Sequence, residues 1–221
     1  MNDAVMAPQP VSFFSLLHAA TQEEHRRLDR LIGLPTGLRS EKDLVRILTA
    51  WDIVWAEVRA GVQRDRRPAG HDERARLLVS AVRALQRIHA DLAELMAGTR
   101  AGRSNHLDIP PSTTDDGLLS GLLDAEPGVW AASYVLRGSR INGGTVAVKI
   151  SDELELPLGV ATSYHSDDAI GPAWAAFRRR LDAWGRIARD VDRDQAVTAT
   201  REAFTVVADR LEAALPAVGR T

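Results

Sequence analysis

The chain has 221 residues, of which 45% are hydrophobic and 26% are charged. This length and composition suit one globular domain with a sizeable core. The 28 Lys and Arg residues nearly balance the 30 Asp and Glu residues, and the formal net charge of −2 provides no overall attraction to nucleic acid or to an anionic membrane. The sequence has no Cys, which excludes disulfides, thiol catalysis, and thiolate or iron–sulfur metal sites.

We find no sequence signal for export or membrane insertion. The first residues lack the basic and apolar regions of a signal peptide, and no apolar run reaches the length of a membrane span. We therefore expect a cytoplasmic protein without a membrane partner. We also expect residues 1–10 to form a flexible segment and residues 11–221 to form one domain, because the sequence shows no internal repeat and no low-complexity linker.

Helical periodicity begins near the N-terminus. A first helix is predicted over residues 12–31, with Leu17 and Leu28 facing inward and with Gly33 and Pro35 ending it. A second helix should begin at Ser40, where Asp43 forms a weaker relative of a capping box. Its apolar residues, spaced by three and four, give the strongest periodic signal in the chain: Leu44, Ile47, Leu48, Trp51, Val54, Trp55 and Val58.

The remaining segments also favour helices. A third helix carries a leucine-rich stripe over residues 77–95 and should stop at Gly98, and a short helix is expected over residues 115–123. Residues 127–150 are predicted to form one helix that contains glycines at 138, 143 and 144, each costing roughly 1 kcal/mol relative to Ala. Helices near 172–189 and 194–215 complete the prediction of an all-α fold, and no segment shows convincing strand alternation.

His25 is the strongest candidate for a metal ligand. It follows Thr21 by four residues and precedes Leu28 by three, which places it on or beside the inward stripe of the first helix. A neutral imidazole there can bind a transition metal or haem iron, although helix position alone is more typical of a histidine that bonds a backbone group. The other histidines at 71, 89, 106 and 165 lie in predicted loops or on polar faces without ligand spacing, and we interpret them as incidental.

Several motifs resemble the heme oxygenase family. Residues 17–29, LHAATQEEHRRLD, resemble its first helix, in which a Thr-x-x-x-His pattern supplies the proximal iron ligand. Residues 133–144, SYVLRGSRINGG, resemble its glycine-containing distal helix, most closely that of the bacterial, bacteriophytochrome-associated type. Residues 171–178, GPAWAAFR, and the pair Ala203-Phe204 match its last helices, and residues 85–95 match its third.

The resemblance implies a single-domain heme oxygenase-like helical bundle. It also implies an enzyme that cleaves haem to biliverdin, carbon monoxide and ferrous iron with O2 and external electrons. The electron donor would be a ferredoxin or a flavoprotein reductase, and a bacteriophytochrome is a candidate acceptor of biliverdin. Haem would be both substrate and cofactor, and the protein would supply ligation, orientation and protons.

The resemblance also assigns residues to the site. His25 would ligate iron within the Thr21-x-x-x-His25 pattern, and Arg178 would bind a propionate through its bidentate fork. His18 stands where animal members have a propionate-binding Lys. For both His18 and Arg178, simple solvent exposure is the alternative. The oxygen pocket and its waters would be shaped by Gly138, Ser139, Asn142 and Gly143.

Some residues depart from the family pattern. Ser139 replaces the Asp of animal enzymes, as it often does in bacterial relatives, and Arg137 replaces a Glu typical of the bacterial stretch. Asn142 either replaces the first of two paired glycines or precedes them after a one-residue insertion. Two other functions remain open: a haem carrier or sensor without turnover, and a haem-free enzyme of the same fold that acts on a vitamin-like or quinone-like substrate.

Overall fold

A computed structural model describes residues 11–32, 38, 40–64, 72–100, 117–157, 159–167 and 169–214. These residues form helices and turns without a strand, which confirms the all-α prediction. The predicted flexible segment 1–10 lies outside the described residues. The helices are α1 (Phe13–Ala20), α2 (Gln22–Ile32), α3 (Glu41–Arg64), α4 (Asp72–Arg100), α5 (Leu118–Leu122), α6 (Glu126–Gly138), α7 (Gly143–Glu153), α8 (Ile170–Ile187) and α9 (Asp190–Ala214).

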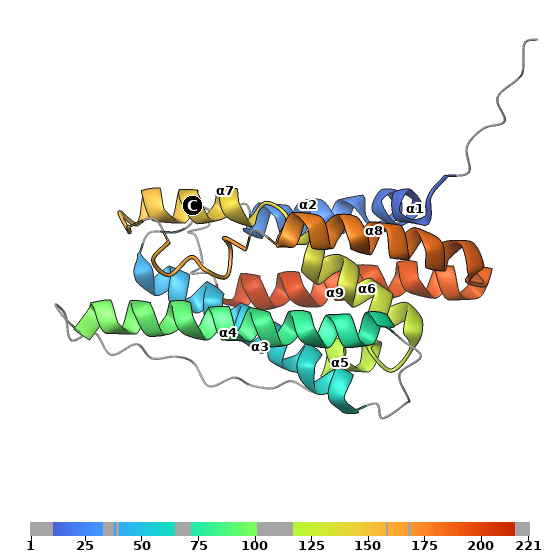
Figure 1. The fold of residues 1–221 in the computed structure, drawn as a ribbon, viewed down its shortest axis with the longest axis horizontal. Coiled ribbons are helices and arrows are strands. Elements are labelled where there is room, and N and C mark those ends of the chain that lie inside the picture. The colour runs from blue at the N-terminus through green and yellow to red at the C-terminus, as the bar shows by residue number, and fades with distance from the viewer. Residues whose placement is uncertain are drawn as a thin grey trace, which may run out of the picture.

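Helix α9 crosses the middle of the bundle (Figure 1) and packs against α2, α3, α5 and α6. Helices α3 and α4 lie side by side, α1 packs on α8, and α6 bridges from α9 to α4 and α8. In Figure 1, α1, α2, α7 and α8 run along the side of the bundle opposite to α3 and α4. None of the described helices combines the length and the apolar character that a membrane crossing requires.

The apolar periodicity of α3 correctly identifies its buried face. All seven residues of the predicted stripe are buried, and Trp55 is fully enclosed. The helix begins after Ser40, whose hydroxyl accepts a hydrogen bond from the backbone N–H of Asp43 at 3.3 Å. On α4, Leu77, Ile88 and Leu95 are buried as the spacing predicts, but the helix continues past Gly98 to Arg100.

The predicted first helix is divided in two at Thr21. The Thr21 hydroxyl donates to the carbonyl oxygen of Leu17 at 2.8 Å, and a hydroxyl that bonds the carbonyl four residues earlier bends a helix. Backbone hydrogen bonds still pass through the break, from Thr21 N to Leu17 O and from His25 N to Thr21 O. His18 and His25 therefore belong to consecutive short helices, α1 and α2.

The prediction of one helix over residues 127–150 is also wrong, since α6 ends at Gly138 and α7 begins at Gly143. The physical reason for the break lies at Gly143. A Cβ atom there would be 2.1 Å from the carbonyl oxygen of His165, so the start of α7 is pressed against the backbone near residue 165. Residues 139–142 make the turn that allows this contact.

Candidate functional site

His18 and His25 lie next to each other on the face that α1 and α2 share. Their ring centroids are 5.5 Å apart, with the ring planes nearly perpendicular. The His25 Nδ1 atom is 2.8 Å from Oδ2 of Asp29, one turn later on α2, and the His25 side chain is 29% exposed. A carboxylate on Nδ1 fixes the tautomer that leaves Nε2 as the available ligand nitrogen, the arrangement that metal-binding histidines use.

Aromatic residues of α1, α6, α8 and α9 lie beside the two imidazoles, of which His18 is exposed. The Phe14 ring stacks on His18 with centroids 6.1 Å apart, and the Phe204 ring of α9 lies 5.5 Å from His25. The Tyr134 hydroxyl of α6 is 3.2 Å from Nδ1 of His18. Trp174 of α8 contacts both Phe14 and Tyr134, with centroid distances of 5.8 Å. The site therefore combines a half-buried imidazole with an extended aromatic wall.

Tyr134 keeps its proton under ordinary conditions. Burial raises the pKa of Tyr134 to about 12, and a hydrogen bond with the Thr21 side chain and the charge of Arg178 only partly oppose this effect. Both Thr21 and Arg178 therefore act on the Tyr134 hydroxyl. The guanidinium carbon of Arg178 is 4.1 Å from the centroid of the Phe14 ring, in cation–π contact.

The structure therefore brings His18, Thr21, His25 and Arg178 together around Tyr134. The neighbouring arginines on α8 do not share this position. Arg179 is exposed, and Arg180 donates from Nε to Glu73 of α4 at 2.9 Å.

The four residues predicted to shape an oxygen pocket lie at the end of α6 and the start of α7. Gly138 faces the Trp174 ring, whose nearest atom would be 3.4 Å from an added Cβ. The Ser139 hydroxyl donates to the carbonyl oxygen of Leu136 at 3.1 Å. Asn142 is exposed at the N-terminus of α7, and Gly143 packs against the backbone of His165. Gly138 thus joins the aromatic wall through Trp174, whereas Gly143 contacts the segment at residue 165.

Sequence reasoning missed several residues of this site. Asp29 follows His25 by four residues, and this spacing could have identified the carboxylate partner. Phe14 precedes His18 by the same interval, which places both on one helical face. Tyr134 and Trp174 stand within the family-like motifs, but their spacing contains no signal that they would meet His18 and Phe14.

His165 lies in the turn segment between α7 and α8, as predicted, but nothing in the sequence indicates that its side chain is buried. That side chain is 5% exposed, and its Nε2 atom has no hydrogen-bond partner. Burial and, to a smaller extent, the nearby charge of Arg140 together lower the pKa of His165 to about 4. His89 is exposed and pairs with Asp52, as a polar helix face predicts, whereas residues 71 and 106 lie outside the described residues. Within the described ranges, no group of three or more His, Asp or Glu residues is arranged to hold a metal ion.

Comparison with solved structures places the fold. The chain is similar to a heme oxygenase from Leptospira interrogans, with a TM-score of 0.67 and 17% sequence identity, over 92% of this chain and 100% of that one. No protein-family model matches the sequence, and no curated protein matches it. The chain therefore has the heme oxygenase fold, as its motifs predict.

Proposed function

We propose that this protein is a heme oxygenase, which binds haem through His25 and oxidises it to biliverdin, carbon monoxide and ferrous iron. The observation that carries the proposal is the oriented imidazole of His25, whose Nδ1 atom is held by Asp29 at 2.8 Å within an aromatic site of the matching fold. Haem is a flat and largely apolar molecule with two propionates, so it needs a ligand, apolar walls and cations.

The residues at the site suit each part of haem. His25 provides one uncommitted ring nitrogen for iron, and Phe14, Tyr134 and Phe204 provide apolar surface. Arg178 lies at the exposed edge of the same cluster and would hold a propionate, with His18 beside it. Thr21 sets the bend that brings α1 and α2 to this position.

When bound, haem supplies both the iron at which O2 is activated and the macrocycle that is oxidised. The protein's part is to orient the substrate and to supply protons. Tyr134, protonated up to about pH 12, can donate a hydrogen bond, and the Ser139 hydroxyl, which donates to Leu136 O, can still accept one from water. Gly138 keeps the α6 backbone accessible beside the Trp174 ring. Electrons would come from a ferredoxin or a flavoprotein reductase, and a bacteriophytochrome would be one acceptor of biliverdin.

Addition of hemin to the purified protein tests the binding step. The wild type should give the Soret spectrum of a histidine-ligated complex, and His25→Ala should abolish it while the helix content measured by circular dichroism stays nearly unchanged. His89→Ala, which removes an exposed histidine of α4, should leave the spectrum intact. If the His25→Ala spectrum equals that of the wild type, His25 is not the ligand.

Reduction of the hemin complex under air tests turnover. The Soret band should decay while the broad red absorption of biliverdin appears, and catalase should not suppress this change. The same assay on Asn142→Gly tests whether Asn142, a departure from the glycine of the family pattern, affects turnover. If both proteins hold haem through His25 but neither degrades it, the chain is a haem carrier or sensor. If hemin gives no Soret complex, the result favours the alternative function, a haem-free enzyme of the same fold.

A further inference from the structure

A groove separate from the His25 site runs between α4 and α8, with α6 beneath it. Its volume is about 390 Å³, within the range of small-molecule sites, about 300–1,000 Å³. Val79 of α4 and Ala173 and Ala176 of α8 form apolar walls, and the charged residues that line it are Arg76, Arg137 and Arg180. Arg178 instead reaches Phe14 of α1, so the groove and the His25 site involve different faces of α8.

Two of the groove's arginines, Arg137 and Arg180, share a carboxylate that is itself buried. Glu73 is 5% exposed; its Oε2 atom accepts from Arg180 Nε at 2.9 Å, and its Oε1 atom lies 3.0 Å from Arg137 Nη2. The second contact is not aligned as a hydrogen bond, since both Glu73 Oε1 and Arg137 Nη2 lack a hydrogen-bond partner. One carboxylate between two guanidiniums leaves this triad with a net positive charge.

Arg137 has two buried nitrogen atoms, Nε and Nη2, without a hydrogen-bond partner. Its side chain is only 11% exposed, and its guanidinium lies 5.3 Å from the Phe177 ring centroid. Burial lowers the pKa of Arg137; Glu73 opposes this shift, and the charges of Arg180 and Arg76 add to it. Because Arg stays protonated in proteins, these effects represent an electrostatic cost that a bound anion would reduce.

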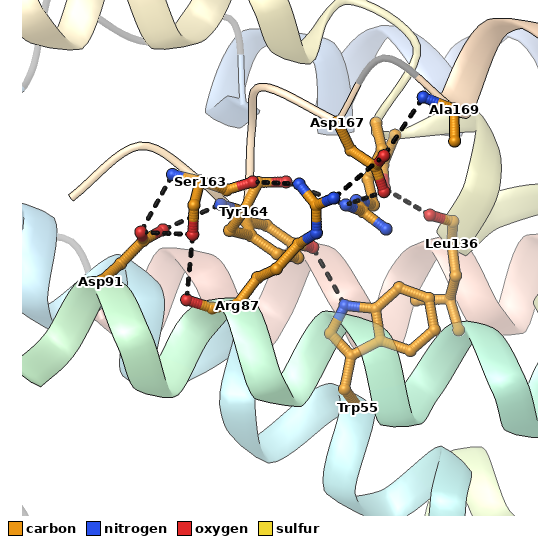
Figure 2. A network of polar contacts seen from close by, with 10 residues as sticks. Trp55, Arg87, Asp91, Leu136, Ser163, Tyr164, Asp167 and Ala169 are labelled. Carbon is orange, nitrogen blue, oxygen red and sulfur yellow. Dashed lines mark hydrogen bonds and ion pairs between the residues drawn. The ribbon is translucent and has the colours of Figure 1, made fainter. Parts of the chain in front are cut away.

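A smaller cavity of about 80 Å³ lies beside the groove and shares Ser80, Arg137 and Ala173 with it. Arg140 lines this cavity, and its buried Nε atom lacks a hydrogen-bond partner. Figure 2 shows how the surrounding segment is held: Asp91 and Arg87 of α4 bind Ser163, and Trp55 donates to the Tyr164 hydroxyl. A preformed frame of this kind favours binding because little of the protein must be ordered by the ligand.

We propose that this groove binds a small organic anion with a carboxylate or phosphate group. Arg137 and Arg180 hold the anionic group, and the ligand's carbon skeleton rests on Val79, Ala173 and Ala176. Guanidinium pairs recognise both oxyanions with bidentate geometry, so the structure defines the class and the experiment separates its members.

The test is a titration of the full chain with inorganic phosphate and, separately, with succinate, by isothermal calorimetry at constant ionic strength. We expect saturable binding of at least one probe at millimolar concentration or below. Arg180→Gln should weaken that binding about tenfold or more, since it removes a charge-assisted contact. Arg179→Gln removes the same charge from the neighbouring exposed position and should change affinity less than threefold.

A second variant separates the groove from general electrostatics. Ala173→Leu adds volume at the groove wall without changing charge, and it should also weaken binding of succinate while circular dichroism shows an intact fold. Binding should be the same before and after loading with hemin, whether or not the protein degrades it. Absence of binding by both probes, equal losses in Arg179→Gln and Arg180→Gln, or displacement of the probe by hemin would each overturn the proposal.

Discussion

Gly143 and Gly144 are adjacent in the sequence but have opposite surroundings. A Cβ atom at Gly143 would meet the His165 carbonyl oxygen at 2.1 Å, whereas a Cβ atom at Gly144 would have no neighbour within 4 Å. Both residues belong to α7, in which glycine is less favourable than alanine. The same substitution should therefore have opposite effects at the two positions.

Gly143→Ala should destabilise the protein by about 2 kcal/mol, because the backbone near residue 165 must move away. Gly144→Ala should stabilise it by about 0.5–1 kcal/mol, since the unfolded chain loses conformational freedom and the helix gains nothing to clash with. Urea unfolding of the two variants and the wild type measures both values. Equal effects of the same sign would contradict the close approach of α7 to residue 165.

His165 predicts a dependence of stability on pH. Its pKa is about 4 in the folded protein, below the value of about 6.5 expected in the unfolded chain. Between these two values the unfolded state binds more protons, so stability is lost as pH falls from about 6.5 towards 4. The full effect is up to about 3 kcal/mol for a shift of this size.

His165→Gln removes this titration. The free energy of unfolding of each protein is measured in urea at several pH values and compared with its own value at pH 7. As the pH falls, this free energy should decrease less in His165→Gln than in the wild type. Parallel curves for the two proteins would show that His165 is not held neutral in the fold.

At the scale of elements, α4 holds the irregular segment that lies between α7 and α8. Asp91, fully buried, accepts from the backbone N–H groups of Ser163 and Tyr164 at 2.9 and 2.8 Å and from the Ser163 hydroxyl at 2.6 Å. Glu94, one turn later and exposed, accepts from the backbone N–H of Ala161. Ala161 has a φ of 52°, a strained value for a residue with a Cβ, and such a conformation persists only where neighbouring contacts hold it.

Asp91→Asn should cost about 3 kcal/mol of stability, because the amide keeps an oxygen on one side of the contact but turns its NH2 donor towards the other, where a buried backbone N–H loses its acceptor. Glu94→Gln is the matched control, since its exposed side chain can still offer an oxygen to Ala161, and its cost should stay below about 1 kcal/mol. Unfolding in urea gives the costs, and hydrogen exchange at Ser163 and Tyr164 localises them. If Asp91→Asn lowers the free energy of unfolding no more than Glu94→Gln does, the segment between α7 and α8 does not depend on Asp91.

At the scale of the whole molecule, the proposed haem site joins α1, α2, α6, α8 and α9, which are distant in the sequence. A ligand held by all of them binds the folded state alone, so it must stabilise the fold by mass action. Hemin at a hundred times its dissociation constant adds about 2.7 kcal/mol, which for a chain of this size raises the thermal midpoint by roughly 5–10 °C. Calorimetry of His25→Ala with hemin should show a much smaller rise than the wild type. Equal rises would place the bound hemin elsewhere on the protein.

The sequence by itself determined the all-α class and the buried face of its most regular helix. Apolar spacing identified the buried face of α3 because helical periodicity is encoded by residues three and four positions apart. The proximity of His18, Thr21 and His25 is local in the same sense, and family-like motifs indicated the fold that the solved heme oxygenase shares. The bend at Thr21 depends on a nearby hydroxyl, yet periodicity alone carries no signal for it.

Only the tertiary structure decided which distant groups meet. Tyr134 reaches His18 across 116 positions, and Glu73 pairs with Arg180 across 107. The break between α6 and α7 lies where Gly143 meets the backbone at residue 165, and the His165 side chain is buried beside it. These features depend on which helices pack against each other. The residues next to a given position in the sequence do not specify that packing.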